Sequence, residues 1–314
     1  MMPLAPPVGV VVANHNNGAF VERALESVAG QSVRDLRVVV LDDASTDRSP
    51  EIIERCLDRL ADPRFQFIRQ DRNQGQAATL ARGLRELDTP FVSFLDSDDI
   101  WHEDFLARHI EVHLNADFPV AMTYCDSQVI DRDDRLLAGT AWWFDSSEPG
   151  HWSGRDIAAE QVPSLDPRTG ALRYPDRSRV TLQPTWSLDG ATNTMSSMMF
   201  RRAFVDLVLV PPSDTLRLYA DYYLATFAGL MTGSIAIHRP LYAYRMHGAN
   251  GHSNAAVLGG TYNTSTRDWG PIRHAVLQTV QAVLRRDAER LIAAFGAQRH
   301  AEAEAQLAGA IGAL

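Results

Sequence analysis

The chain has 314 residues, which suits one large domain or one domain with a substantial appendage. Its 30 basic and 39 acidic side chains leave a net charge of -9, which argues against non-specific nucleic-acid binding as the main activity. The two cysteines, Cys56 and Cys125, lack metal-ligand spacing and cannot build a disulfide framework, so a reducing compartment is favoured. No apolar run reaches the roughly 20 residues that span a bilayer, and the start lacks a signal-peptide pattern. We expect a cytoplasmic protein with no transmembrane segment, and peripheral contact with the inner membrane face stays open.

Apolar, strand-like runs alternate with helical patterns in the first part of the chain. Strands are expected at residues 8–13, 36–41, 65–68 and 91–95. Helices are expected at residues 20–28, from an N-cap at Ser49 onward, and at residues 74–87. This order is typical of parallel, right-handed βαβ units, so we predict an α/β fold with a doubly wound, Rossmann-like sheet.

The middle of the chain is less regular. Helices are expected at residues 105–113, from 202, and at 218–230, and strands at 120–124, 195–200 and 235–244. Residues 126–187 are rich in Pro, Asp, Gly and Trp, and a long irregular insertion in a compact domain is usually functional. We assign it to covering the substrate.

The C-terminal part is Ala-rich and strongly helical from residue 271. A broad apolar stripe runs along it, formed by Val276, Val280, Val283, Leu284, Leu291, Ile292 and Phe295. Such a stripe is expected to pack against its own domain or against a second subunit, so a homodimer through these helices is possible. A membrane-surface helix is the less favoured alternative.

Several carboxylates come directly after the run at 91–95. They are Asp96, Asp98 and Asp99. Carboxylates this close repel one another unless a cation lies between them, and Mg²⁺ and Mn²⁺ prefer oxygen ligands. The pattern favours a divalent metal beside a nucleotide diphosphate, and a solvated turn that caps the next helix is the plainer alternative.

Polar residues also follow the first two expected strands. Asn14 and His15 follow the first strand, and Asp42 and Asp43 follow the second. Ligands of a parallel sheet bind outside the carboxyl ends of its strands. These side chains and those that follow residue 95 are therefore expected to line one crevice.

The order of motifs resembles the family-2 glycosyltransferases, inverting enzymes of the A-type glycosyltransferase (GT-A) fold. The motifs are VVVANHN at 10–16, SVAGQS at 27–32, LDDASTD at 41–47, RNQGQAA at 72–78, FLDSDD at 94–99, SSMMFRR at 196–202 and ADYYL at 220–224. The resemblance implies a GT-A-like domain at residues 1–245 that binds a nucleotide sugar and carries the catalytic site. It makes 126–187 an acceptor-side insertion, and 246–314 a loop with a helical extension.

The resemblance also implies a donor site. Asp43 matches the residue that bonds the nucleobase, Asp96 matches the ribose contact, and Asp98 matches the ligand of a divalent cation, Mn²⁺ or Mg²⁺. The expected donor-binding residues are Ala13, Asn14, His15, Asp42, Asp43, Asn73, Gly75, Asp96, Ser97 and Arg245. Asp42 and Asp43 could instead form a turn that caps the next helix, and Asp99 is favoured as a helix cap or as a hydrogen-bond acceptor behind the ligands, rather than as a ligand itself.

Catalysis is expected to depend on Asp221, which matches the general base that takes the proton of the acceptor hydroxyl. An N-cap role for Asp221 is compatible with this. His247 is expected as a further metal ligand or phosphate contact, and Arg245 as a partner of the diphosphate. For His247, a loop histidine without function is the alternative.

Three departures from the family pattern stand out. His15 replaces a flat ring such as Tyr, Ala220 replaces a carboxylate before Asp221, and Leu80 with Ala81 replaces a common Arg–Asn donor contact. The second departure bears on acceptor geometry, and the third removes a donor contact.

The implied function is metal-dependent, inverting transfer of a sugar from a nucleotide-diphosphate sugar, with UDP- or dTDP-sugars favoured. The acceptor could be a sugar, a lipid-linked sugar or a small molecule. A nucleotidyltransferase is one alternative, although it would normally carry a Gly-rich, basic loop where this chain has ANHNNG. A non-catalytic nucleotide-sugar binding protein is the other, and the presence of both Asp98 and Asp221 argues against it.

Overall fold

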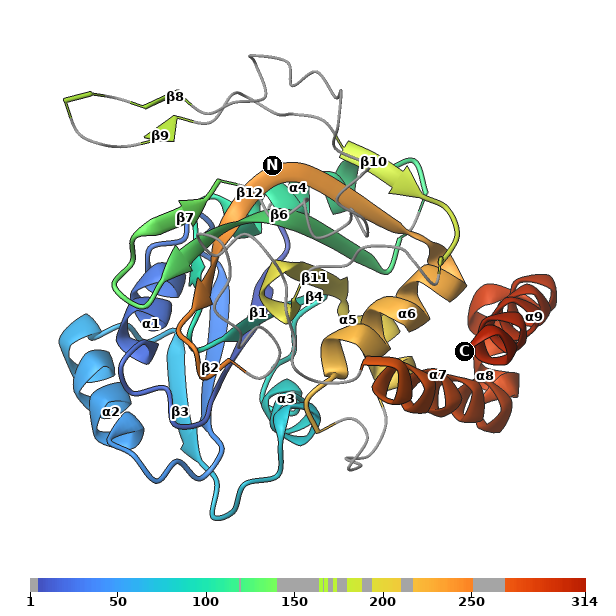
Figure 1. Cartoon of the computed structure of the whole chain (residues 1–314), viewed down its shortest axis with the longest axis horizontal. Coiled ribbons are helices and arrows are strands. Elements are labelled where there is room, and N and C mark those ends of the chain that lie inside the picture. Colours follow the sequence, from blue (N-terminus) through green and yellow to red (C-terminus); the bar gives the residue numbers. More distant parts are fainter. Residues whose placement is uncertain are drawn as a thin grey trace.

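The computed structural model describes residues 5–118, 120–139, 164–165, 167–168, 172–173, 180–187, 194–209, 217–250 and 269–314. These residues form a large mixed sheet with helices on both faces (Figure 1). The α/β architecture and the helical C-terminal extension that the sequence predicts are confirmed.

The first four long strands run parallel in the spatial order β3, β2, β1, β4. Their bounds are β1 (Val8–Asn14), β2 (Leu36–Asp42), β3 (Phe65–Arg69) and β4 (Phe91–Asp96). β-Branched residues dominate β1 and β2, and both strands are almost entirely buried, as expected for strands covered on two faces. The predicted βαβ units are therefore present.

The sheet continues past β4 with mixed polarity. β11 (Met198–Arg201) runs antiparallel between β4 and β6 (Met122–Asp131). β12 (Ser234–Met246) lies parallel to β6, and β10 (Val180–Gln183) closes the edge. The short strand β5 (Ile100–Trp101) pairs with β12, which draws the segment after β4 against the end of β12.

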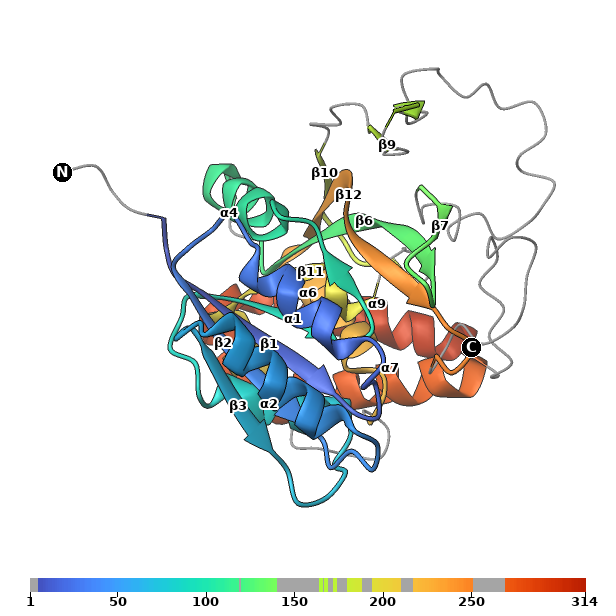
Figure 2. The same cartoon turned by 90° about the vertical axis from the view of Figure 1, so that its left-hand side faces the viewer.

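Helices cover both faces of the sheet. α1 (Val21–Ala29), α2 (Ser49–Leu60) and α4 (Phe105–Asn115) pack on one face, over inward-facing residues such as Val10 and Val12 of β1. The other face carries α3 (Gln76–Leu84), α5 (Arg202–Val208) and α6 (Ala220–Thr232), over residues such as Val11. Figure 2 shows α1 and α2 in front of the sheet, with α7 and α9 behind it.

The C-terminal helices extend the second of these cores. They are α7 (Trp269–Arg286), α8 (Ala288–Phe295) and α9 (Ala297–Ala313). Most of the apolar stripe, including Val276, Leu284 and Leu291, is buried in the same cluster as α6. The stripe therefore packs against its own chain, one of the two expected outcomes, although Ile292 stays 39% exposed. No helix among the described residues is long and apolar enough to cross a membrane.

Several element boundaries differ from the prediction. Ser49 is the first residue of α2 rather than its N-cap, because Asp47 Oδ1 accepts a hydrogen bond from Ser49 N at 2.9 Å and satisfies that end. A 3₁₀ turn, Met195–Ser197, occupies the start of the strand expected at 195–200. α3 is shorter than residues 74–87, because Gly75 with its φ of +85° ends the preceding loop.

The insertion expected at 126–187 is regular at its start, where the prediction of irregular structure is wrong. β6 continues to Asp131 and turns into β7 (Leu136–Ala138). Short pairs follow in β8 (Ser164–Leu165) and β9 (Leu172–Arg173). Most of the remaining insertion, with Trp142, Trp143 and Trp152, lies outside the described residues.

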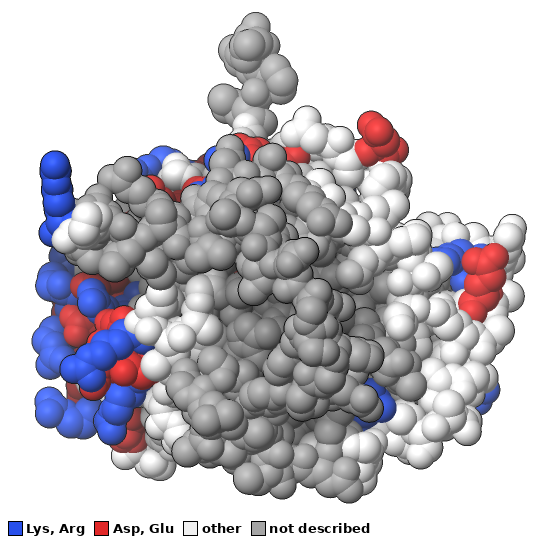
Figure 3. Space-filling view, turned by 45° about the horizontal axis from the view of Figure 1, so that its top comes forward, with Lys and Arg blue, Asp and Glu red and all other residues white. Residues whose placement is uncertain are grey.

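Charged side chains gather on the side of the molecule that carries α1 and α2, with both signs intermingled (Figure 3, left). Arg59 pairs there with Glu22 and Glu26 at 2.7 Å each, and Arg23 pairs with Asp134 at 3.2 Å. Exposed pairs of this kind add little to stability, because water and salt screen their attraction. They balance one another rather than form a surface of one sign.

Candidate functional site

The carboxyl ends of β1, β2 and β4 meet at one edge of the sheet. In the strand register Asn14 lies beside Asp42, and Ala13 lies beside Asp96. Ser97 N then donates to Ala13 O at 3.2 Å, so the turn after β4 folds back over the end of β1. The predicted convergence of three strand ends is confirmed.

Asp42 is fully buried and builds a turn. Its Oδ1 accepts from Asn14 Nδ2 at 2.8 Å and from Ser45 Oγ at 2.6 Å, and its Oδ2 accepts from Ser45 N at 3.0 Å. Both carboxylate oxygens thus bond to protein groups. Among the alternatives that the sequence left open for Asp42, these contacts match the turn.

Asp43 organises the loop that leads into α3. Its Oδ1 accepts from Gln74 N at 2.8 Å and Gln70 Nε2 at 2.9 Å, and its Oδ2 accepts from Gly75 N at 2.8 Å. Gly75 has a φ of +85°, and a Cβ there would lie 2.4 Å from Arg217 Cγ. Only glycine fits this position without strain.

His15 and Asn73 lie together beside Asp43. His15 Nδ1 lies 2.8 Å from Asp43 O, an acceptor, so Nδ1 carries the proton and donates. His15 Nε2 then accepts from Asn73 Nδ2 at 2.9 Å. Arg217 bonds to Asn73 from the chain just before α6. Four segments of the chain therefore meet at the expected nucleobase end of the site.

Asp96 lies at the centre of the acidic group. Its Oδ1 accepts from Gln76 Nε2 at 3.0 Å, and its N donates to Ser196 Oγ at 3.1 Å. The pKa of Asp96 is raised to about 7. Desolvation is the largest cause, and repulsion from Asp98 and Asp221 adds to it. Because Coulomb repulsion falls with distance, the carboxylates of Asp98 and Asp221 both lie near that of Asp96.

Asp98 and His247 face each other although 149 residues separate them in sequence. His247 Nε2 lies 3.1 Å from Asp98 Oδ2, and the two side chains are 7% and 19% exposed. A carboxylate oxygen and an imidazole nitrogen are ligands that Mn²⁺ accepts in proteins. No group of three or more His, Cys, Asp or Glu suited to a metal occurs in the described part of the chain, so this pair would leave positions for other ligands. The residues fit a cation that a diphosphate also binds.

Arg245 has a different setting from the one that the sequence predicts. Its side chain is only 1% exposed, and its guanidinium donates to Asp98 O at 2.8 Å and Asp131 O at 2.9 Å. It also pairs with Asp134 Oδ1 at 2.6 Å. A diphosphate contact would require the guanidinium to leave these acceptors, and in this structure the guanidinium bonds to the protein instead.

Asp99 is 2% exposed and lies behind the site. Its Oδ1 accepts from Arg245 N at 3.0 Å, and desolvation raises its pKa well above the usual range of a carboxyl group. It ties the turn after β4 to the end of β12. The α4 helix begins only at Phe105, so Asp99 is not its cap.

Asp221 lies in the first turn of α6, after the N-cap residue Tyr219. Its Oδ1 accepts from Tyr222 N at 2.7 Å. Desolvation raises the pKa of Asp221 to about 6, against the lowering effect of this hydrogen bond. A carboxylate with a pKa near neutrality is suited to general base catalysis.

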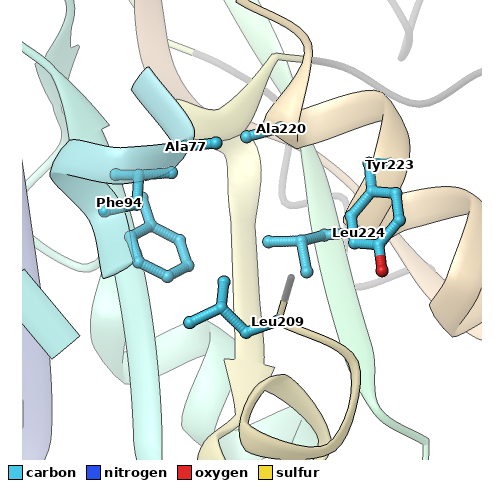
Figure 4. Close-up of a pocket in the computed structure, with 7 residues that line it drawn as sticks. Ala77, Phe94, Leu209, Ala220, Tyr223 and Leu224 are labelled. Carbon is cyan, nitrogen blue, oxygen red and sulfur yellow. The ribbon is translucent and has the colours of Figure 1, made fainter. Parts of the chain in front are cut away.

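A small apolar gap separates α3 from α6 beside the acidic group (Figure 4). It is lined by Ala77, Leu80, Phe94, Leu209, Ala220, Tyr223 and Leu224. Ala77 and Ala220 face each other across its top. The small side chain of Ala220 has a clear reason here, since a glutamate at this position would place a carboxylate in apolar surroundings.

Sequence reasoning missed three polar residues of the site. Gln76 bonds to Asp96, Ser196 accepts from Asp96 N, and Asn250 bonds to the backbone of His247 and of Arg245. Gln76 and Ser196 lie inside the quoted motifs RNQGQAA and SSMMFRR, which was an available signal. Asn250 lies with Arg245 and His247 in the segment YRMHGANGHSN at 244–254, so it carried a similar signal.

Comparison with known proteins identifies the family. The model of glycosyl transferase family 2 matches residues 9–205. An uncharacterized glycosyltransferase of Nostoc is 28% identical over 255 residues, which cover 79% of this chain and 67% of that protein. The succinoglycan biosynthesis protein ExoO of Rhizobium meliloti is 34% identical over 132 residues, covering 42% of this chain and 36% of ExoO.

Solved structures share the fold at low sequence identity. Staphylococcus aureus TarS 1–349 in complex with UDP-GlcNAc aligns with a TM-score of 0.55 and 15% identity, over 94% of this chain and 72% of that one. The mannosyltransferase PcManGT from Pyrobaculum calidifontis, in complex with GDP-Man and Mn²⁺, aligns with a TM-score of 0.51 and 17% identity, over 99% and 75%. The family match, the sheet and the acidic edge agree: the chain belongs to glycosyl transferase family 2 and is an enzyme that transfers sugars.

Proposed function

We propose that the protein transfers a sugar, with inversion, from a nucleotide-diphosphate sugar to an acceptor hydroxyl, with a divalent cation at Asp98 and with Asp221 as general base. The observation that carries the proposal is the 3.1 Å contact of Asp98 Oδ2 with His247 Nε2 beside the strand ends. The raised pKa of Asp96, to which Asp98 and Asp221 both contribute, supports placing Asp221 near that pair. The expected metal ligand and the expected base are thereby neighbours of the same carboxylate, although Asp98 and Asp221 are 123 positions apart in the chain.

The donor would lie along the strand ends. The group around Asp43, His15 and Asn73 receives the nucleobase, and Asp96 with Gln76 receives the ribose. Gln76 Oε1 is buried without a hydrogen-bond partner among the described residues, so it offers an acceptor to a ribose hydroxyl. UDP- and dTDP-sugars are favoured, since a carboxylate accepts the imide N–H of uracil or thymine.

The metal site would consist of Asp98 and His247, with Mn²⁺ or Mg²⁺ as the cation. When bound, the cation supplies charge stabilisation at the departing diphosphate. Ser97 and Asn14 would keep the strand ends around this site in place, because Ser97 N bonds to Ala13 O and Asn14 Nδ2 bonds to Asp42 Oδ1. Arg245 is left out of the diphosphate contacts, because its guanidinium already bonds to three protein acceptors.

Asp221 would take the proton of the acceptor hydroxyl as its oxygen attacks the anomeric carbon. The position of Asp221 at the beginning of α6 keeps its carboxylate beside Asp96 and thus beside the donor. One carboxylate on the acceptor side and a departing diphosphate on the other side are the requirements of a single displacement with inversion.

Two variants test the division of roles. We expect Asp98→Ala to lose metal-dependent donor binding, and Asp221→Asn to keep that binding while transfer is abolished. Binding is measured by calorimetry with UDP, dTDP and GDP, each with and without Mn²⁺, and turnover by release of the free nucleotide. Equal loss of binding in both variants would contradict the proposal, and pyrophosphate formation from a triphosphate and a sugar phosphate would point to a nucleotidyltransferase.

A further inference from the structure

We propose that Asn250, acting with the buried Arg245, is a positioning residue that holds His247 against Asp98 and so prepares the metal-binding pair before a cation arrives. The inference rests on the proposed function and adds the residues that arrange its metal site. It starts from the segment 245–250, which begins with the last two residues of β12 and lies against the turn after β4.

Arg245 fixes the beginning of this segment to the turn that carries Asp98. Its backbone N donates to Asp99 Oδ1 at 3.0 Å, and its Nε donates to Asp98 O at 2.8 Å. One residue therefore bonds to both members of the Asp98–Asp99 pair. The backbone of Asp98 cannot move away from β12 without breaking a buried, charge-assisted hydrogen bond.

The far end of the Arg245 side chain is anchored to the β6–β7 turn. It donates to Asp131 O at 2.9 Å and pairs with Asp134 at 2.6 Å. Its guanidinium carbon lies 4.9 Å from the centre of the Phe20 ring. Because the side chain is only 1% exposed, water does not compete for these contacts.

Asn250 closes the segment into a tight loop around His247. Its Oδ1 accepts from His247 N at 2.9 Å, and its Nδ2 donates to Arg245 O at 2.6 Å. Gly248, with a φ of +82°, allows the chain to reverse between His247 and Asn250. Asn250 is 8% exposed, so its amide is committed to these two backbone groups.

The imidazole of His247 is oriented as well as placed. Its ring lies 4.8 Å from the ring of Phe20, centre to centre. Nε2 is the ring nitrogen that faces Asp98 Oδ2, at 3.1 Å. Residues that orient a metal ligand raise metal affinity, because the ligand is ordered before the metal binds.

The experiment compares Mn²⁺ binding by the full chain and by Asn250→Ala, in the presence of UDP. We expect about 10- to 100-fold weaker Mn²⁺ affinity, the range found when such an outer partner is removed. Electron spin echo spectroscopy of bound Mn²⁺ should show coupling to an imidazole nitrogen in the parent protein. That coupling should be weakened or lost in Asn250→Ala and absent in His247→Ala.

Two further variants keep the result interpretable. Asn115→Ala removes a matched, exposed amide that bonds to Glu111 O in α4, and it should leave both readouts unchanged. Asn250→Asp keeps the acceptor for His247 N and loses the donor to Arg245 O, so it should retain part of the nitrogen coupling even if Asn250→Ala folds poorly.

Failure of this inference is distinguishable from failure of the proposed function. If Asp98→Ala loses Mn²⁺ while Asn250→Ala keeps parental affinity and nitrogen coupling, the positioning role is overturned and the proposed function stands. If Asp98→Ala binds Mn²⁺ as well as the parent protein, the proposed metal site itself fails.

Discussion

At the scale of single residues, Asp221 is the proposed general base, and its burial disfavours the charged form of its carboxyl group. Desolvation raises its pKa to about 6, so the carboxylate form that a general base requires is lost as the pH falls through that value. We expect kcat/KM to fall about tenfold for each pH unit below about 6, the limit for one essential ionised group. A pH profile of transfer tests this, and an acidic limb centred near 4 would contradict it.

The same raised pKa predicts a change in stability. A carboxyl group whose pKa is higher in the folded state than in the unfolded state destabilises the fold at high pH, and this penalty disappears below the unfolded pKa. We expect Asp221→Asn to be more stable than the parent by on the order of 2 kcal/mol at pH 8. The gain should shrink through pH 6 and vanish near pH 4 in urea titrations. Asp88→Asn, on an exposed turn, provides the control.

Gly75 gives a sharp prediction about the loop that Asp43 holds. An alanine there would be strained by the φ of +85° and would meet Arg217, so we expect Gly75→Ala to lose about 1 to 3 kcal/mol of stability. Donor affinity should fall with it. Gly309→Ala is the matched control, because its Cβ would meet nothing within 4 Å and α9 should gain slightly. Equal melting temperatures for the two variants would contradict this reasoning.

At the scale of elements, α4 carries two buried histidines against the sheet. His109 Nδ1 contacts Thr123 Oγ1 at 2.6 Å, and His113 Nε2 contacts Met199 O at 3.3 Å. Desolvation lowers the pKa of His113 to about 4, and it lowers the pKa of His109 well below the usual range of histidine. Neutral histidines therefore stabilise this packing.

The lowered pKa values predict acid lability. A histidine with a depressed folded pKa contributes its full stability above its unfolded pKa, near 6.5, and loses it as the pH falls toward the folded value. The free energy of unfolding of the parent should fall as the pH drops from 6.5 to 4. In His113→Gln this fall should be smaller, by on the order of 3 kcal/mol. Urea titrations across this range measure it. His274→Gln, on the part-exposed face of α7, should follow the parent.

The elements themselves were largely predictable from sequence. The runs of valine and leucine at residues 8–13 and 36–41 fit strands covered on both faces, and polar residues marked where each strand stopped. The predicted helix boundaries were wrong where two nearby side chains could each cap the same helix end, as Asp47 and Ser49 could at the start of α2. Such competition is decided by local geometry that the order of residues does not contain.

The site was predictable only in part, for a physical reason. Asp42, Asp43, Asp96 and Asp98 follow strands, so the topology alone brings them to one edge. The role of Arg245 depends on acceptors in the β6–β7 turn and on Phe20, which lie far from it in sequence. Whether a basic side chain faces a ligand or a buried carbonyl is a tertiary property that no motif specifies.

At the scale of the whole molecule, Arg299 joins the C-terminal helices to the catalytic sheet. Its Nε donates to Met231 O at 3.2 Å, and one terminal nitrogen donates to Pro184 O at 3.3 Å and Gly229 O at 3.4 Å. Arg299, which lies in α9, thereby donates hydrogen bonds to carbonyls in the last turn of α6 and to the carbonyl of Pro184, which follows β10.

Loss of this connection should be costly. We expect Arg299→Met to lower the free energy of unfolding by about 1 to 3 kcal/mol, because buried carbonyls lose charged donors. Urea titration measures the change. Arg290→Met, which removes an exposed arginine of α8, should alter stability by less than about 0.5 kcal/mol. If both variants lose the same amount, Arg299 does not join the two parts.

Arg299 follows the strands and α6 in the chain, and this order matters during synthesis. Translation delivers the strands and α6 to the folding chain before α9 exists, and the local βαβ units can condense at that time. The carbonyls of Gly229 and Met231 remain without this donor until Arg299 is made, 68 residues after Met231. A nascent chain stalled before Arg299 would thus hold the strands and α6 without the hydrogen bonds that connect α6 to α9.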